Sequence, residues 1–216
     1  MGGRLGNAVV ARTEHGMILR ERPNSRPQLS LALQAARDRM RRATQGWRAL
    51  DGEQVAAWRR YAQSLATRSP ETGALLVPKA VHVFTGLATK FLQVHPGDAI
   101  PTLPPSGIFF GDLVQIVVDA DGGEIVFTAN RPNAPGVVTE LLFQVLPGPH
   151  NATRPRSYVA ADFAVFTFTG LEARVTARPG WLAAAARFVE SATGRAMPLV
   201  ELGRVLLGGR PLLSRP

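Results

Sequence analysis

The apolar residues of this chain follow two different periods, and the period changes near the middle of the sequence. In residues 29–47, apolar side chains recur every three or four positions, which is the spacing of one face of an α-helix. Residues 55–65 and 81–94 repeat this period. The pattern therefore predicts three amphipathic helices in the first half of the chain.

The ends of the predicted helices carry local signals. Asp51 follows the first helix and is well placed to cap the second, because Gln54 stands three residues later as in a capping box. Pro78 precedes the third helix, where the missing N–H of proline does no harm. Trp47 and Trp58 both fall on the apolar faces, so we expect them in the core of a helical hairpin.

Two short apolar runs precede the helices. Residues 8–13 and 17–22 read as β-strands, and residues 14–16 join them through Gly16, which can adopt the positive φ of a tight turn. A two-stranded hairpin is only marginally stable alone in water. We therefore expect this hairpin to pack against another surface.

The second half of the chain alternates with the period of β-strands. Residues 98–107 are rich in proline and predict a linker, and beyond them short apolar segments are separated by turn residues. Seven strands in about 100 residues are typical of a β-sandwich. The predicted strands are 113–119, 124–130, 137–146, 163–170, 171–177, 182–190 and 196–207.

Together these patterns predict an α+β protein. Its N-terminal part is a β-hairpin plus a three-helix module, and an all-β immunoglobulin- or fibronectin III-like sandwich follows. The last two strands, joined by ESATGR, resemble the final hairpin of fibronectin type III domains, a resemblance that covers residues 108–207. The expected organisation is a basic hairpin and helical module at 1–97, a linker at 98–107, the sandwich at 108–209 and a tail at 210–216.

Charge is distributed unevenly along the chain. The net charge is +9, and residues 1–70 hold 13 arginines against 5 acidic residues. Residues 71–216 are almost balanced, with 12 basic and 11 acidic side chains. The basic character therefore belongs to the N-terminal part, which indicates an acidic partner surface or a nucleic acid for that part.

Catalytic and metal-binding motifs are missing from the sequence. The chain has no cysteine, and its four histidines stand apart from one another, so no thiolate or histidine zinc motif is formed. No glycine-rich phosphate loop and no nucleophile elbow is present. Residues 119–124, DADGGE, fit a hairpin turn better than a calcium loop. We expect a protein that is not an enzyme, with no cofactor, no metal, no membrane span and no signal peptide.

The N-terminal segment GNAVVARTEHGMILRERP carries a further resemblance. It looks like the N-terminal arm, GN-V-x-R-x-G-x-x-x-R-x-x-P, of a group of functionally uncharacterised bacterial and prophage proteins that also share the W..L and AW helix pair and a C-terminal sandwich. The resemblance implies a role in particles or on surfaces. The matching positions are Gly6, Asn7, Val9, Arg12, Gly16, Arg20 and Pro23.

The leading hypothesis is a non-enzymatic structural or interaction protein, most simply a minor phage or phage-like virion component that decorates or stabilises a larger assembly. Its partners would be other protein subunits, and it would be oligomeric or particle-bound, otherwise cytoplasmic. The residues expected to contact the partner are Arg12, Ile18, Leu19, Arg20, Arg22 and Arg26.

Two alternatives remain open at this point. In the first, the arginine-rich helices bind nucleic acid, since the helix pair around Trp47 and Trp58 resembles the middle of an HMG box; the expected phosphate contacts are Arg37, Arg41, Arg42, Arg48, Arg59 and Arg60. In the second, the sandwich is a surface carbohydrate-binding or adhesion module. Most of its phenylalanines fit inward-facing positions, which leaves only Trp181 and Tyr158 as candidates for an exposed platform.

Overall fold

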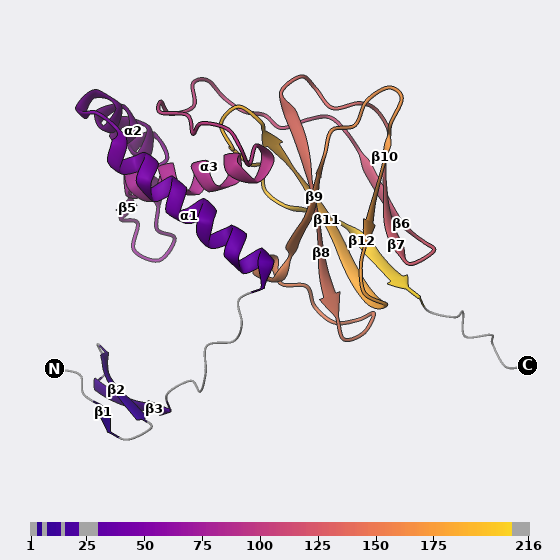
Figure 1. The fold of residues 1–216 in the computed structure, drawn as a ribbon, viewed down its shortest axis with the longest axis horizontal. Coiled ribbons are helices and arrows are strands. Elements are labelled where there is room, and N and C mark those ends of the chain that lie inside the picture. The colour runs from indigo at the N-terminus through magenta and orange to yellow at the C-terminus, as the bar shows by residue number, and fades with distance from the viewer. Residues whose placement is uncertain (1–3, 6–7, 14–15, 22–29, 209–216) are drawn as a thin grey trace, which may run out of the picture. The chain divides into compact units, whose positions relative to one another are not determined.

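The protein is described here from a computed structural model, which defines residues 4–5, 8–13, 16–21 and 30–208. The chain forms two compact units, Met1–Asp38 and Arg39–Pro216. Figure 1 shows the elements of each unit in chain order. Three helices and several antiparallel sheets make up the fold, so the predicted α+β class is confirmed.

The first unit contains a small three-stranded antiparallel sheet. Its strands are β1 (Arg4–Leu5), β2 (Ala8–Thr13) and β3 (Gly16–Glu21), in the order β1-β2-β3. The predicted hairpin is confirmed, with Leu19 opposite Val10 and Gly16 opposite Thr13. Gly16 has a φ of 121°, which explains why a glycine stands where β3 begins.

The three predicted helices are present: α1 (Leu31–Ala49), α2 (Gly52–Ser64) and α3 (Ala80–Val94). Trp58 and Phe84 are buried at their centre, with ring centroids 5.0 Å apart in an edge-to-face arrangement, and Trp47 lies 5.6 Å from Phe84. The prediction that both tryptophans belong to the helical core is therefore confirmed. Between α2 and α3 the chain forms two short paired strands, β4 (Thr67–Arg68) and β5 (Leu75–Leu76).

The start of α2 is the predicted capping box. The Asp51 carboxylate accepts a hydrogen bond from the backbone N–H of Gln54 at 2.8 Å, and the Gln54 side chain accepts one from the backbone N–H of Asp51 at 3.0 Å. Two N–H groups that the helix itself leaves unpaired are thereby satisfied. This local arrangement sets the sharp turn between α1 and α2.

Seven strands build the C-terminal sandwich. One sheet has the order β10-β7-β6 and the other β12-β11-β8-β9, an immunoglobulin-like arrangement of three strands against four. The strands are β6 (Ile116–Asp121), β7 (Glu124–Ala129), β8 (Val137–Leu146), β9 (Val159–Ala164), β10 (Glu172–Thr176), β11 (Gly180–Glu190) and β12 (Val200–Leu207).

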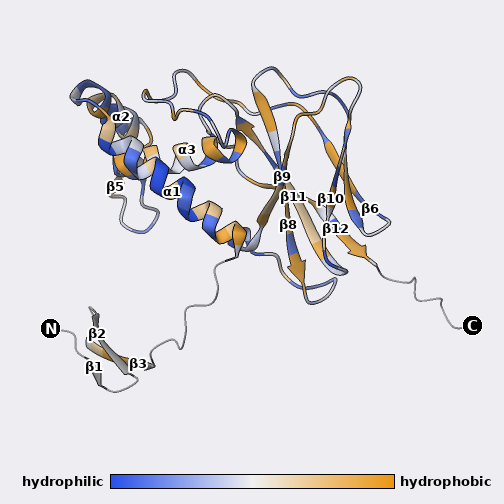
Figure 2. Ribbon diagram, in the orientation of Figure 1, coloured by the Kyte–Doolittle hydropathy of each residue, from blue (hydrophilic) through white to orange (hydrophobic). Residues whose placement is uncertain are grey.

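The sandwich core draws on both sheets. Ile125 and Phe127 from β7 pack with Leu141 from β8 and with Leu182 and Ala184 from β11. Figure 2 shows the apolar run along β8 and the mixed polar and apolar faces of α1. The apolar side chains that these seven strands point inward bury enough surface to hold the two sheets together without disulfides.

One strand lies elsewhere than predicted. The segment 163–170 was expected to be a strand, but β9 begins at Val159 and ends at Ala164. Residues 165–170 instead form a turn closed by the bridge between Thr167 and Gly170. The Asn133 side chain holds this turn, because its Oδ1 accepts the backbone N–H of Phe166 at 2.8 Å. Phe166 is buried as a result, whereas Phe168, which was expected to face inward, is exposed.

Candidate interaction surfaces

A buried cluster of charges joins the helical module to the sandwich. Glu140 on β8 has a side chain that is only 1% exposed, and the Nζ of Lys90 on α3 lies 2.8 Å and 2.9 Å from its two carboxylate oxygens. Arg187 on β11 donates from Nε to the same carboxylate at 2.5 Å. The Lys90 ammonium also lies 5.5 Å from the centre of the Phe163 ring. One carboxylate thus binds two cations from different elements.

The electrostatics of the cluster follow from its geometry. Burial alone would raise the pKa of the Glu140 carboxyl, but the hydrogen bonds from Arg187 and Lys90 together hold this pKa below its usual value. Glu140 is therefore ionised at neutral pH. A buried carboxylate with two charge-assisted partners is costly to break, since removal of a partner leaves a charge without compensation.

A glycine at the β11–β12 turn makes the second contact between the helical module and the sandwich. A Cβ on Gly194 would lie 2.4 Å from the carbonyl oxygen of Leu87 and 2.6 Å from the backbone nitrogen of Phe91, both on α3. Gly194 also has a φ of 76°, in the left-handed region. Only glycine allows this turn to approach the helix backbone so closely.

The proline-rich segment 98–107 lies along the helical module. The indole N–H of Trp58 donates to the carbonyl oxygen of Thr102 at 2.8 Å, and Ile100 packs against the helical core. These contacts hold Ile100 and Thr102 against the helices. The helical module and the sandwich belong to one compact unit, Arg39–Pro216, and this segment joins them.

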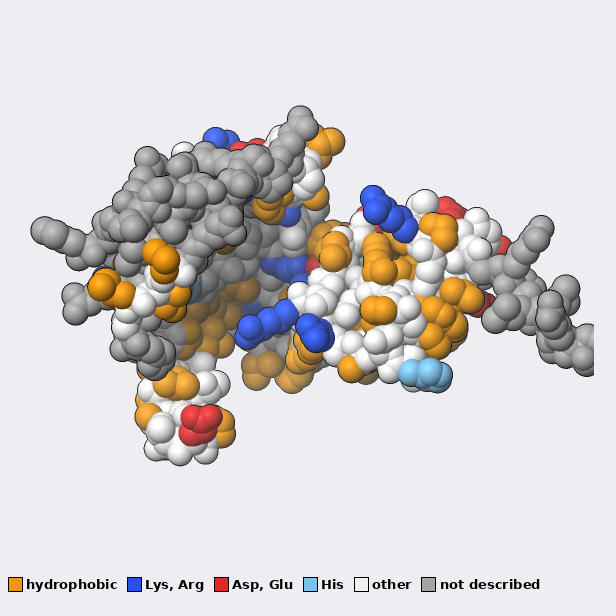
Figure 3. All heavy atoms as spheres, turned by 90° about the horizontal axis from the view of Figure 1, so that it is seen from below, with side chains coloured by type: hydrophobic (Ala, Val, Ile, Leu, Met, Phe, Trp, Pro, Cys, Tyr) orange, Lys and Arg blue, Asp and Glu red, His pale blue; other side chains and the backbone are white. Residues whose placement is uncertain are grey.

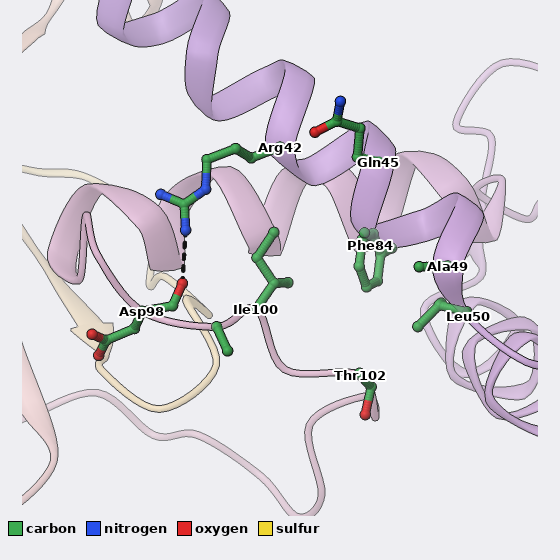
Figure 4. Close-up of a pocket in the computed structure, with 10 residues that line it drawn as sticks. Arg42, Gln45, Ala49, Leu50, Phe84, Asp98, Ile100 and Thr102 are labelled. Carbon is green, nitrogen blue, oxygen red and sulfur yellow. Dashed lines mark hydrogen bonds between the residues drawn. The ribbon is translucent and has the colours of Figure 1, made fainter.

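A crevice of about 280 Å³ lies beside this segment, between α1 and residues 98–102 (Figure 4). Phe84, Ile100 and Leu50 give it an apolar lining. Arg42 reaches across the crevice and donates to the backbone carbonyls of Pro96 and Asp98, the latter at 2.8 Å. The guanidinium is thus used to hold the chain. The crevice presents no arrangement of acid, base and nucleophile for catalysis.

The arginines expected to contact phosphates fall into three places. Arg37, Arg41 and Arg48 are exposed and lie within about 40° of one another around the axis of α1. Arg59 and Arg60 are exposed on α2. Arg42 is turned to the carbonyls described above. On the face seen in Figure 3, basic side chains stand in small separate groups.

The N-terminal sheet exposes consecutive apolar side chains. Met17, Ile18 and Leu19 on β3 are 74%, 51% and 64% exposed. Successive residues of a strand point to opposite faces, so both faces of this sheet are apolar at β3. Arg12 and Arg20 lie on β2 and β3, whereas Arg22 and Arg26 lie outside the described residues. The structure thus places two of the expected partner contacts, Ile18 and Leu19, on an accessible surface.

The first half of α1 is also exposed. All residues from 31 to 38 are exposed, and among them and just beyond, Leu31, Leu33 and Met40 are large apolar side chains in solvent. The apolar face predicted for residues 29–47 is packed only from Ala43 onward. The predicted apolar face is therefore present, but only the C-terminal half of the helix reaches the helical core.

The sandwich offers little support for a carbohydrate platform. Trp181 and Tyr158 are both half-buried, so neither offers an open aromatic face.

Within the described residues, no three histidine, cysteine, aspartate or glutamate side chains gather as a metal site would require. No helix in the same part of the chain is long and apolar enough to cross a membrane.

Reasoning from the sequence missed the buried charge cluster. Its signal was a lone acidic residue, Glu140, inside the apolar strand VVTELLFQVL, where a charge needs a partner. The sequence near Glu140 does not show which residue is the partner, since Lys90 is 50 positions away.

Comparisons with protein-family models, with curated proteins and with solved structures gave no significant match.

Proposed function

We propose that this chain is a non-enzymatic structural and interaction protein that decorates or stabilises a larger assembly. The observation that carries the proposal is the exposure of Met17, Ile18 and Leu19 on an N-terminal sheet with two apolar faces. Contiguous apolar surface of this kind marks contact sites with other proteins. A small sheet also gains most of its stability from what it packs against.

The rest of the molecule suits a structural component. The charge cluster around Glu140 and the close approach of Gly194 to α3 hold the helices on the sandwich as one body. Helices fixed on the sandwich in this way lose little conformational entropy when the protein binds, which favours a defined position in an assembly.

The resemblance of the N-terminal arm to bacterial and prophage proteins supports a phage-like virion as the assembly. The basic N-terminal part fits an acidic neighbouring subunit, with Arg12 and Arg20 as the charged contacts on the described strands. The particle is then also where the protein is located.

The experiment compares the wild-type chain with Ile18→Asp, expressed with a small tag in the organism that carries the gene. The wild type should sediment with large particles, and Ile18→Asp should remain in the light fractions, because a carboxylate cannot be buried in an apolar interface. Val145→Asp, a change of an exposed valine on β8, is the matched control and should sediment as the wild type does. Wild-type protein found only in light fractions contradicts the proposal.

Nucleic-acid binding is the second candidate function. The observation in its favour is the row formed by Arg37, Arg41 and Arg48 on one face of α1. Binding through three phosphates should weaken with salt at a logarithmic slope of about −3 on duplex DNA. Arg48→Ala should lower that slope by about one in a gel-shift series. Absence of binding at low salt removes this candidate.

A further inference from the structure

A groove lies between the two sheets of the sandwich where β6 and β12 begin. The two strands run side by side, and a Cβ on Gly203 of β12 would lie 3.5 Å from a side-chain carbon of Val118 on β6. Ahead of this contact, the strands leave a groove of about 260 Å³. Six apolar side chains and one neutral amide line it: Val114, Gln115, Ile116, Ala186, Phe188, Val200 and Leu202.

The segment just before β6 carries large apolar side chains that stand out into solvent. Phe110 and Leu113 are 81% and 80% exposed. The segment lies against the groove, because a Cβ on Gly111 would lie 3.5 Å from the Phe188 ring of the groove lining. Val200, which also lines the groove, is 57% exposed. One face of the sandwich thus carries both an apolar hollow and protruding apolar side chains.

Hydrogen bonds fix this segment on the sandwich. Arg195 donates from Nη1 to the carbonyl oxygen of Gly107 at 2.8 Å, and its guanidinium lies 5.8 Å from the centre of the Phe109 ring. The Asp112 carboxylate accepts the backbone N–H of Ala134 at 2.8 Å. The backbone is therefore held on both sides of the exposed phenylalanine, so little conformational entropy is lost when a partner covers it.

We propose that this face binds the same face of a second copy of the chain, with Phe110 of each copy entering the groove of the other. The inference goes beyond the proposed function, because the N-terminal sheet takes no part in it. The groove of about 260 Å³ is large enough, since a cavity of about 150 Å³ already holds a benzene ring. A surface that carries both a hollow and the group that fills it is self-complementary, as a twofold symmetric contact requires.

The charges of this face favour a second copy over a charged partner. The groove lining contains no charged side chain. Among residues 108–118 the one charged side chain is that of Asp112, whose carboxylate already accepts hydrogen bonds from Asn133 and Ala134. Beside the segment, Arg195 and Glu190 pair with each other at 2.8 Å. Two such faces meet with little repulsion, whereas a strongly charged partner finds no unpaired opposite charge among these residues.

The area of the face is that of a small, reversible interface. Burial of one exposed aliphatic or aromatic side chain removes on the order of 100 Å² of apolar surface from water. Five large side chains of the face would be covered in this way, so each copy buries about 500 Å² and the dimer about 1,000 Å², at the lower limit for a specific contact. They are Ile108, Phe110, Leu113, Val117 and Val200.

Sedimentation velocity of the full-length protein at about 1 μM to 1 mM tests the inference. The wild type should dimerise, and so should Val145→Asp, the control at a valine that is 61% exposed on β8. Phe110→Asp and Val200→Asp should each dimerise at least about tenfold more weakly, because a carboxylate would enter an apolar contact. Ile18→Asp should dimerise as the wild type does. Circular dichroism checks that each variant is folded.

Cysteine cross-linking tests which residues meet across the contact. The chain has no cysteine, so Phe110→Cys and Val200→Cys each introduce a single thiol. Under mild oxidation, an equimolar mixture of these two variants should form a disulfide-linked dimer. Phe110→Cys mixed with Val145→Cys is the control and should remain unlinked.

Three results overturn the inference. The first is a wild type that stays monomeric throughout the concentration range, and the second is dimerisation of Phe110→Asp equal to that of Val145→Asp. The third is a mixture of Phe110→Cys and Val200→Cys that links no better than its control. If Ile18→Asp alone prevents dimerisation, the copies meet through the N-terminal sheet, so this inference fails while the proposed function stands.

Discussion

Replacement of Gly194 by alanine tests the close packing between the sandwich and α3. The new Cβ would lie 2.4 Å from the Leu87 carbonyl oxygen and 2.6 Å from the Phe91 backbone nitrogen. Both atoms belong to a helix backbone, so neither can move as a side chain would. Gly136→Ala is the matched control, because Gly136 has a φ of 75° against 76° for Gly194 and nothing within 4 Å of its Cβ position.

The magnitude has two parts. A non-glycine residue in the left-handed region costs about 1–2 kcal/mol, and this cost is common to both variants. Overpacking against atoms that cannot move adds about 1–3 kcal/mol at Gly194 only. We therefore expect Gly136→Ala to lower the free energy of unfolding by about 1–2 kcal/mol and Gly194→Ala by about 2–5 kcal/mol.

The assay is urea unfolding followed by circular dichroism and by tryptophan fluorescence, to which Trp47 and Trp58 of the helical module and Trp181 of the sandwich all contribute. The difference between the two variants isolates the contact with α3. Equal destabilisation, to within about 0.5 kcal/mol, would refute the view that this turn is pressed against the helix.

Three further predictions concern the charge cluster around Glu140, the cap of α2 and the contact of Trp58 with the segment 98–107. Glu140→Gln should lower the free energy of unfolding by about 3 kcal/mol, because Lys90 and Arg187 would lose their counter-charge. Since pairing holds the pKa of Glu140 below its usual 4.5, the stabilisation is present above that pH and is lost as pH falls through the lower folded-state value. Acid titration of stability should therefore be steeper for wild type than for the glutamine variant, and equal slopes would contradict this. Asp51→Ala should cost about 1 kcal/mol in urea unfolding through loss of the α2 cap; no change would mean that the capping box is not stabilising. Trp58→Phe should cost about 1–3 kcal/mol, because it leaves the Thr102 carbonyl without its donor, and an unchanged midpoint would show that water replaces the indole N–H.

The candidate surfaces were only partly predictable. The sequence pointed to Ile18 and Leu19 as contact residues, and both are exposed. It also grouped Arg42 with Arg41, but Arg42 turns to the carbonyls of Pro96 and Asp98. A helix position fixes which face a residue is on, whereas the segment that passes that face comes from elsewhere in the chain.

The elements themselves were determined by local sequence. Apolar period, turn residues and the Asp51–Gln54 capping box all act over a few positions, so three helices, the N-terminal hairpin and most of the strands were predictable from the chain alone. The pairing of Asn133 with the turn near Phe166 was not local, and the strand predicted there was misplaced.

Tertiary structure alone decided how the elements meet. It determined that Lys90 and Arg187 share Glu140, that Gly194 is pressed on α3, that half of the α1 face is uncovered and that the β6 and β12 edges enclose an apolar groove. Hydrophobic burial is non-directional, so an apolar face specifies that it must be covered but not by what. The partner is chosen by contacts between distant parts of the chain, and those exist only once the chain has folded.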